Sequence, residues 1–218
     1  MRQATSARFL AWGYVTVNAT RRAIQHDPQD RGVIDDTLKI IAATKNMAEV
    51  DADSVTLYGG SGGGTLALEL AGVTELAAVA AGEPATIIYM GMFTQQHIIT
   101  DATGKPIGDR RWDVMESDAH SLYTPQLREQ TRKKLAEISC PVLILHGDQH
   151  LLKHFNHDVF IPELKAMGKS TEVLVYPGEN HGFYWGRSEH PLMPLKANRD
   201  ADAFFRKHLK TQPRAVSA

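Results

Sequence analysis

Short apolar runs alternate along this chain with segments that have a helical period. Residues 54–58, 76–81, 141–146 and 172–176 are rich in β-branched, leucine or alanine side chains, which predicts buried strands. A further strand is predicted at 13–18. Because no run approaches 18 consecutive apolar residues, the pattern predicts no membrane-spanning helix.

Helices are predicted between these strands. Residues 33–47 carry Ile34, Leu38 and Ile41 at helical spacing, after which the strand at 54–58 begins. Further helices are predicted at 65–71, at 159–167 and at about 196–209, and residues 7–12 read as the end of another helix. Strands that alternate with helices predict an α/β fold, a mostly parallel sheet with helices on both faces.

Residues 83–135 are the least regular part of the chain. They mix proline, glycine and charged residues with short helical stretches such as 126–135. We expect one domain over residues 1–218, with a lid or insertion at about 83–135.

The composition limits the classes of function that the protein can have. The 218 residues carry a formal net charge of −1, which argues against nucleic acid or an anionic membrane surface as a partner. The single cysteine, Cys140, excludes an intramolecular disulfide, and residues 1–8 lack the apolar core of a signal peptide. Both features favour the cytoplasm, although they do not determine the compartment.

The strand at 54–58 leads into Gly59-Gly60-Ser61-Gly62-Gly63 and then into a helix. Gly-x-Ser-x-Gly between a strand and a helix is typical of a nucleophile elbow, a sharp turn that exposes a serine hydroxyl. A serine hydroxyl needs a base to become a nucleophile at neutral pH. Among ten histidines, His181 is the best candidate for that base, because it lies in the glycine-containing loop after the strand at 172–176.

Three segments together carry a family resemblance: the strand with Gly-x-Ser-x-Gly, the run PVLILHGD at 141–148, and VLVYPGENHGF at 173–183. They resemble the α/β-hydrolase superfamily, and most closely its prolyl-oligopeptidase-like and dienelactone-hydrolase-like branches, over about residues 7–210. The resemblance implies a Ser–acid–His order and a serine hydrolase that uses neither a metal nor an organic cofactor.

The acid is open. The resemblance places a catalytic Asp three residues after Gly147, where this chain has His150. Asp148 is the nearest carboxylate and ranks first. Glu83, directly after the strand at 76–81, ranks second, and Glu179 ranks third.

The histidines at 146, 150, 154 and 157 raise a metal-binding alternative. On a helix, three of them share a face and resemble zinc ligands. Since no carboxylate or cysteine completes the set in sequence, and Leu151, Leu152 and Phe155 lie among them, packing is the preferred interpretation and no metal is expected.

The resemblance also implies an oxyanion hole of two backbone N–H groups. Gly62 supplies one of them, whereas the usual His-Gly segment for the second is not found in this sequence. We therefore expect a chain shortened at its N-terminus relative to the family, with a gap of about 10 Å between the strand at 13–18 and the nucleophile strand. A homodimer that pairs across the gap is one arrangement left open.

The sequence thus predicts a serine hydrolase that transfers an acyl group from an ester or peptide-like bond to water. Phe183, Tyr184 and Trp185 either line its substrate pocket or belong to the core. The alternative is a module of the same fold that binds a small molecule or partner without turnover.

Overall fold

The computed structural model describes residues 2–18, 30–93, 98–100, 102–103, 106–109, 111–115 and 117–214. Its centre is a four-stranded, fully parallel sheet in the order β1-β2-β5-β6. These strands are β1 (Thr56–Gly60), β2 (Ala78–Gly82), β5 (Val142–Gly147) and β6 (Thr171–Tyr176). The predicted α/β fold is confirmed, and each of these strands lies within two residues of its predicted position.

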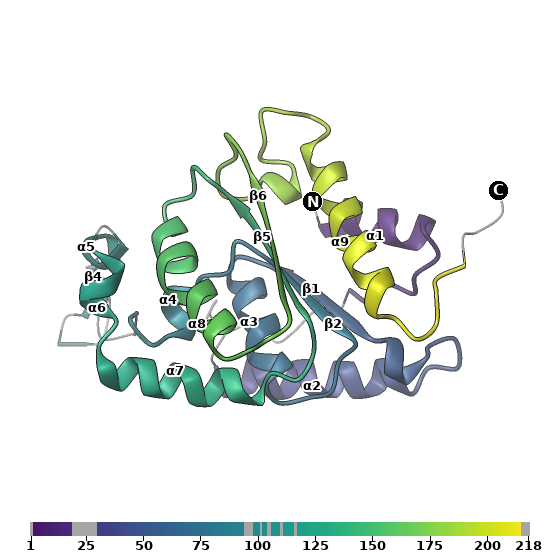
Figure 1. Ribbon diagram of the computed structural model, residues 1–218, viewed down its shortest axis with the longest axis horizontal. Coiled ribbons are helices and arrows are strands. Elements are labelled where there is room, and N and C mark those ends of the chain that lie inside the picture. Colours follow the sequence, from purple (N-terminus) through teal and green to yellow (C-terminus); the bar gives the residue numbers. More distant parts are fainter. Residues whose placement is uncertain are drawn as a thin grey trace.

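Helices cover both faces of the sheet (Figure 1). One face packs against α3 (Gly62–Ala71), α4 (Thr86–Tyr89), α7 (Pro125–Glu137) and α8 (Ile161–Ala166). The other face packs against α1 (Arg2–Ala11) and α9 (Met193–His208). Helix α2 (Arg31–Lys45) lies outside α3, against Leu66 and Leu70.

The central strands show why both faces are apolar. In β2, Val79 and Ala81 face the α3 side, whereas Ala78 and Ala80 face the α9 side. Successive side chains of a strand point to opposite faces, so a strand covered on both sides must be apolar throughout. Strand β5 is built in the same way and is buried along its whole length.

The remaining elements are short. Residues 83–135 hold, besides α4 and α7, an antiparallel pair of β3 (Ile98–Thr100) and β4 (Pro106–Asp109) and the helices α5 (Arg111–Met115) and α6 (Ala119–Leu122). Single turns of helix occur at η1 (Ala52–Ser54) and η4 (Phe183–Trp185), and a π-helical segment, η3 (Phe155–Phe160), leads into α8. The single domain and the lid stay predictions.

The prediction of a strand at 13–18 is wrong. Residues 14–18 have no strand pairing in the described structure, where β1 forms the edge of the sheet. Instead, the Tyr14 ring packs edge-on against Phe9, and its hydroxyl donates a hydrogen bond to Asp202 at 2.7 Å. Apolar alternation alone does not make a strand, because a strand needs a backbone partner for its N–H and C=O groups. The expected gap between two strands therefore does not arise here.

The start of α2 also differs in detail. The helix begins at Arg31, where the Asp30 carboxylate accepts a hydrogen bond from the Val33 N–H at 3.0 Å. Asp30 is thus an N-cap. Asp35 and Asp36 lie one turn further on, inside the helix.

The elbow between β1 and α3 depends on close backbone contact. A Cβ atom added to Gly59 would lie 2.1 Å from the Gly63 carbonyl oxygen, and one added to Gly64 would lie 3.3 Å from the Gly59 carbonyl oxygen. A Cβ atom added to Gly63 would meet nothing within 4 Å. The close approach therefore requires a glycine at 59, two residues before the serine, but not at 63, two residues after it.

We expect Gly59→Ala to lower the free energy of unfolding by about 3 kcal/mol or more, because the obstructing atom is backbone and cannot rotate away. Gly63→Ala is the matched control. It should leave stability unchanged or raise it by up to about 1 kcal/mol, since alanine is the better helix former. Urea unfolding followed by circular dichroism measures both, and equal stability of the two variants would contradict the elbow geometry.

Candidate active site

The parallel sheet brings all candidate residues to one edge. Ser61 follows β1, Glu83 follows β2, Gly147 ends β5, and the loop with His181 follows β6. The carboxyl ends of parallel strands meet at the same edge, which is where α/β folds usually bind ligands. The register fixes their order, because Gly60 pairs with Gly82 and Gly82 pairs with Leu145.

Ser61 has the strained backbone of a nucleophile elbow. Its φ of 55° and ψ of −128° are sparsely populated for a residue with a side chain. Its N–H donates to the Gly82 carbonyl oxygen at 2.8 Å, which holds the turn against the end of β2. Because α3 begins at Gly62, Ser61 lies at the positive end of the helix dipole, next to N–H groups of the first turn.

Among the described residues, Glu83 is the second non-glycine residue with a positive φ, at 43°, and its side chain is fully buried. Oε2 accepts a hydrogen bond from the Gly182 N–H at 2.7 Å, and Oε1 accepts one from the Gly147 N–H at 3.3 Å. His181 Nδ1 lies 3.3 Å from Oε2. A buried carboxylate is costly unless such donors surround it, so this one is held in place by the end of β5 and the loop after β6.

Asp148, which ranked first from the sequence, is placed elsewhere. Oδ1 accepts hydrogen bonds from the Gly178 N–H at 2.8 Å and from the Gln149 side chain at 3.0 Å. These bonds, that from Gln149 first, hold the pKa of Asp148 below its usual value. Its carboxylate ties the turn after β5 to the turn after β6, and this contact fits a positioning role rather than an interaction with His181.

Glu179, the third candidate, is buried and accepts a hydrogen bond from the Ser188 hydroxyl at 2.8 Å. Of the three candidate acids, the structure brings Glu83 against His181. The sequence signal for Glu83 was a charged residue directly after a fully apolar strand.

The aromatic residues after His181 divide between core and site. Phe183 and Tyr184 are fully buried in the cluster that faces α9. Trp185 is half-buried, and its ring centroid lies 6.3 Å from that of His181. Atoms of Tyr184 and Trp185 lie within 2.7 Å of where a Cβ of Gly60 would stand, so this segment packs directly on the elbow. Of the three aromatic residues, Trp185 is therefore the one that is not fully buried.

A row of histidine rings continues from the site into the protein. The His181 and His150 rings are stacked with centroids 4.6 Å apart. The His146 ring lies 6.0 Å from His150 and 4.3 Å from His157. Burial lowers the pKa of His146 to about 3 and that of His150 to about 4, so both imidazoles are uncharged at neutral pH.

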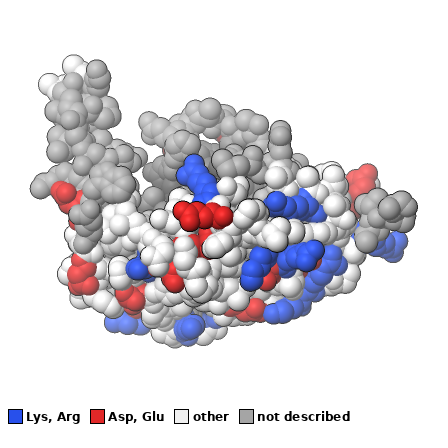
Figure 2. Space-filling view, turned by 90° about the horizontal axis from the view of Figure 1, so that it is seen from above, with Lys and Arg blue, Asp and Glu red and all other residues white. Residues whose placement is uncertain are grey.

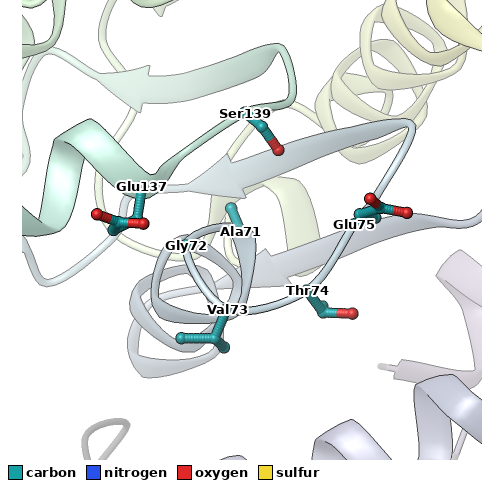
Figure 3. A pocket seen from close by; sticks show the side chains of 7 residues that line it. All are labelled: Ala71, Gly72, Val73, Thr74, Glu75, Glu137 and Ser139. Atoms are coloured by element: carbon teal, nitrogen blue, oxygen red, sulfur yellow. The ribbon is translucent and has the colours of Figure 1, made fainter.

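A shallow pocket of about 200 Å³ lies far from these residues (Figure 3). It is lined by the end of α3, the loop before β2, Glu137 at the end of α7, and Ser139 after that helix. Since Glu75 precedes β2 and Glu83 follows it, the pocket is at the opposite edge of the sheet. It offers no activated nucleophile and is not the candidate site.

The parallel sheet and the strand–elbow–helix unit define an α/β-hydrolase fold. A model of the prolyl oligopeptidase family matches residues 19–212, which is most of the chain. The chain therefore belongs to the prolyl oligopeptidase family.

Solved structures share the fold. A putative dienelactone hydrolase from Klebsiella pneumoniae subsp. pneumoniae is 16% identical, with a TM-score of 0.51, and the match covers 82% of this chain and 62% of that one. The esterase E25 is 19% identical, with a TM-score of 0.54, over 83% of this chain and 56% of that one. Thermogutta terrifontis esterase 2 is 20% identical, with a TM-score of 0.50, over 83% and 68%.

At these identities the likeness shows the fold alone. The chain spans 62% of the length of the first of these structures and 56% of the second. No curated protein is similar enough to count as a match. Within the described part of the chain, no helix has both the length and the apolar character needed to cross a membrane.

The buried histidines predict a loss of stability in mild acid. In the unfolded chain they bind protons below about pH 6.5, whereas in the folded chain His146 and His150 do so only near pH 3 to 4. Stability is therefore full above pH 6.5 and falls as the pH drops, by up to about 1.4 kcal/mol per pH unit for each histidine. Urea unfolding between pH 7 and pH 5 in metal-free buffer measures this slope, and His146→Leu should reduce it. A slope unchanged by that substitution would show that His146 is not a buried, uncharged group.

Proposed function

We propose that the chain is a serine hydrolase in which Ser61 is the nucleophile, His181 the base and Glu83 the acid. The observation that carries the proposal is the buried Glu83 carboxylate, which lies 3.3 Å from His181 Nδ1 at the edge of the sheet where the elbow presents Ser61. A carboxylate on Nδ1 fixes the tautomer in which Nε2 is free to accept a proton.

The reaction is acyl transfer to water. The Ser61 hydroxyl oxygen attacks the carbonyl carbon of the substrate while His181 Nε2 takes the hydroxyl proton. The carbonyl π electrons move to oxygen, and the resulting oxyanion is stabilised by the Gly62 N–H at the N-terminus of α3. His181 then gives its proton to the leaving group, and water repeats the sequence on the acyl-enzyme to regenerate Ser61.

Glu83 acts through its charge and takes no part in the proton transfer. Its negative charge stabilises the imidazolium that forms when His181 carries the proton. The N–H groups of Gly147 and Gly182 keep the carboxylate from rotating away. His181, with 32% of its side chain exposed, can reach a substrate from the same position.

The substrate class is an ester or a peptide-like bond in a small molecule. Membership of the prolyl oligopeptidase family supports the peptide-like bond, and the esterases that share the fold support the ester. The described part of the face seen in Figure 2 carries both basic and acidic side chains.

The second candidate is a module that binds such a molecule without turnover. It is favoured by His150, which stands where the resemblance implies an Asp and covers one face of the His181 ring. An organophosphorus probe separates the two candidates, because it reacts only with an activated serine. Thermogutta terrifontis esterase 2 is known in a form phosphonylated by sarin.

Kinetics with p-nitrophenyl acetate and butyrate test the assignment of the acid. We expect Ser61→Ala to abolish turnover and Glu83→Gln to lower kcat by about 1000-fold or more, since a neutral side chain no longer stabilises the imidazolium. Asp148→Asn, the matched control, should change kcat by less than about tenfold. Circular dichroism and melting temperature verify that each variant folds. A folded Asp148→Asn variant that loses more activity than Glu83→Gln would contradict the proposal.

A further inference from the structure

A buried cluster next to the candidate triad has the donor set of a metal site. Glu83, His146 and His150 each offer one ligand atom, and these three atoms lie within 4.8 Å of one another. Glu83 and His146 are fully buried, and His150 is 5% exposed. They come from the ends of two neighbouring strands, so the sheet itself brings them together.

Most imidazole nitrogens of the cluster have no hydrogen-bond partner in the described structure. Both ring nitrogens of His146 and Nδ1 of His150 are buried there without a hydrogen-bond partner. A buried polar atom without a partner typically costs about 1–3 kcal/mol. Here, unpaired ring nitrogens face one another and a carboxylate. This arrangement is expected of side chains that bind a metal ion.

Two imidazoles and one carboxylate form a common ligand set for zinc in sites that keep a fourth position for water. Zinc–ligand distances of about 2.0–2.2 Å require ligand atoms about 3.3 Å apart in a tetrahedron, so small side-chain rotations close the cluster. Both imidazoles are uncharged at neutral pH, as ligation requires. The Gly147 and Gly182 N–H groups orient the carboxylate, as outer partners do in metal sites.

We propose that Glu83, His146 and His150 bind one divalent transition-metal ion, with zinc the preferred ion. This differs from the helical set of histidines weighed from the sequence. His154 points away, with 63% of its side chain exposed and its Nδ1 paired with Asp158 at 3.0 Å. The carboxylate that the sequence pattern lacked is Glu83, which is more than 60 residues away along the chain.

The site has a consequence for the reaction, which rests on the proposed function. A metal ion bound to Glu83 would take up much of the negative charge that stabilises the His181 imidazolium. Zinc in the cluster would therefore inhibit the hydrolase by withdrawing the acid from the triad, without contact between the ion and Ser61.

Metal binding is measured first, without reference to activity. Tag-free protein is treated with a chelator, dialysed and titrated with Zn²⁺ by calorimetry and with Co²⁺ by its visible absorption. We expect one ion per chain and the intense absorption of tetrahedral Co²⁺. His146→Leu should weaken Zn²⁺ binding by about 100-fold or more, because changes to outer partners alone cost 10- to 100-fold. His150→Gln provides a second test if His146→Leu does not fold.

His154→Ala is the matched control, since it removes a nearby histidine that is not a ligand. It should bind Zn²⁺ as the unaltered chain does. Failure of the unaltered chain to bind either ion, or binding that both folded ligand variants retain, would overturn the site and indicate that water satisfies these nitrogens.

Ester turnover of the unaltered chain, with chelator and with Zn²⁺, tests the consequence separately. Turnover should fall over the same free Zn²⁺ concentrations that saturate the calorimetric site. Turnover that persists at saturation would overturn the inhibition. If the metal-free chain hydrolyses no ester, the proposed function fails, and calorimetry still decides the metal site.

Discussion

The candidate site depends on the hydrogen bonds that the buried carboxylate of Glu83 accepts. Glu83 follows β2, the second strand of the four-stranded sheet, and accepts hydrogen bonds from the last residue of β5 and from the loop after β6. An unpaired charge in this position would cost several kcal/mol, so the end of β5, the loop after β6 and the carboxylate stabilise each other's placement. The same carboxylate lies 3.3 Å from His181 Nδ1, and its bond to the Gly182 N–H holds the loop of His181 beside the end of β2.

Backbone strain occurs at the same edge of the sheet. Ser61 and Glu83 are the two non-glycine residues with a positive φ among those described. They follow neighbouring strands, and the Ser61 N–H bonds to the carbonyl of Gly82, which precedes Glu83. Strained residues of this kind persist when the surrounding structure holds them, and they concentrate at functional sites. Their pairing at the edge of the sheet supports an active site rather than a loop of arbitrary shape.

Much of this could be predicted from the sequence. The four strands of the sheet, the elbow with Ser61 and the loop with His181 follow from apolar runs and glycine spacing. The strand at 13–18 could not be judged from its own pattern, because pairing depends on neighbours elsewhere in the chain. The partner of His181 could be narrowed to three carboxylates, with Glu83 ranked second, but the sequence could not choose among them. Chain order favours Asp148, whereas the register of β2 and β5 places Glu83 against the histidine, 98 residues away in sequence.

The register also places Glu83 beside His146 and His150, so the proposed metal ion and His181 would share one carboxylate. The central claim is that Ser61 is an activated nucleophile in this chain. Labelling with a fluorophosphonate, followed by peptide mapping, tests it most directly. The account predicts one phosphonyl adduct on Ser61 in metal-free protein, and none after heat denaturation. A folded chain that remains unlabelled, or an adduct on another residue, would contradict it.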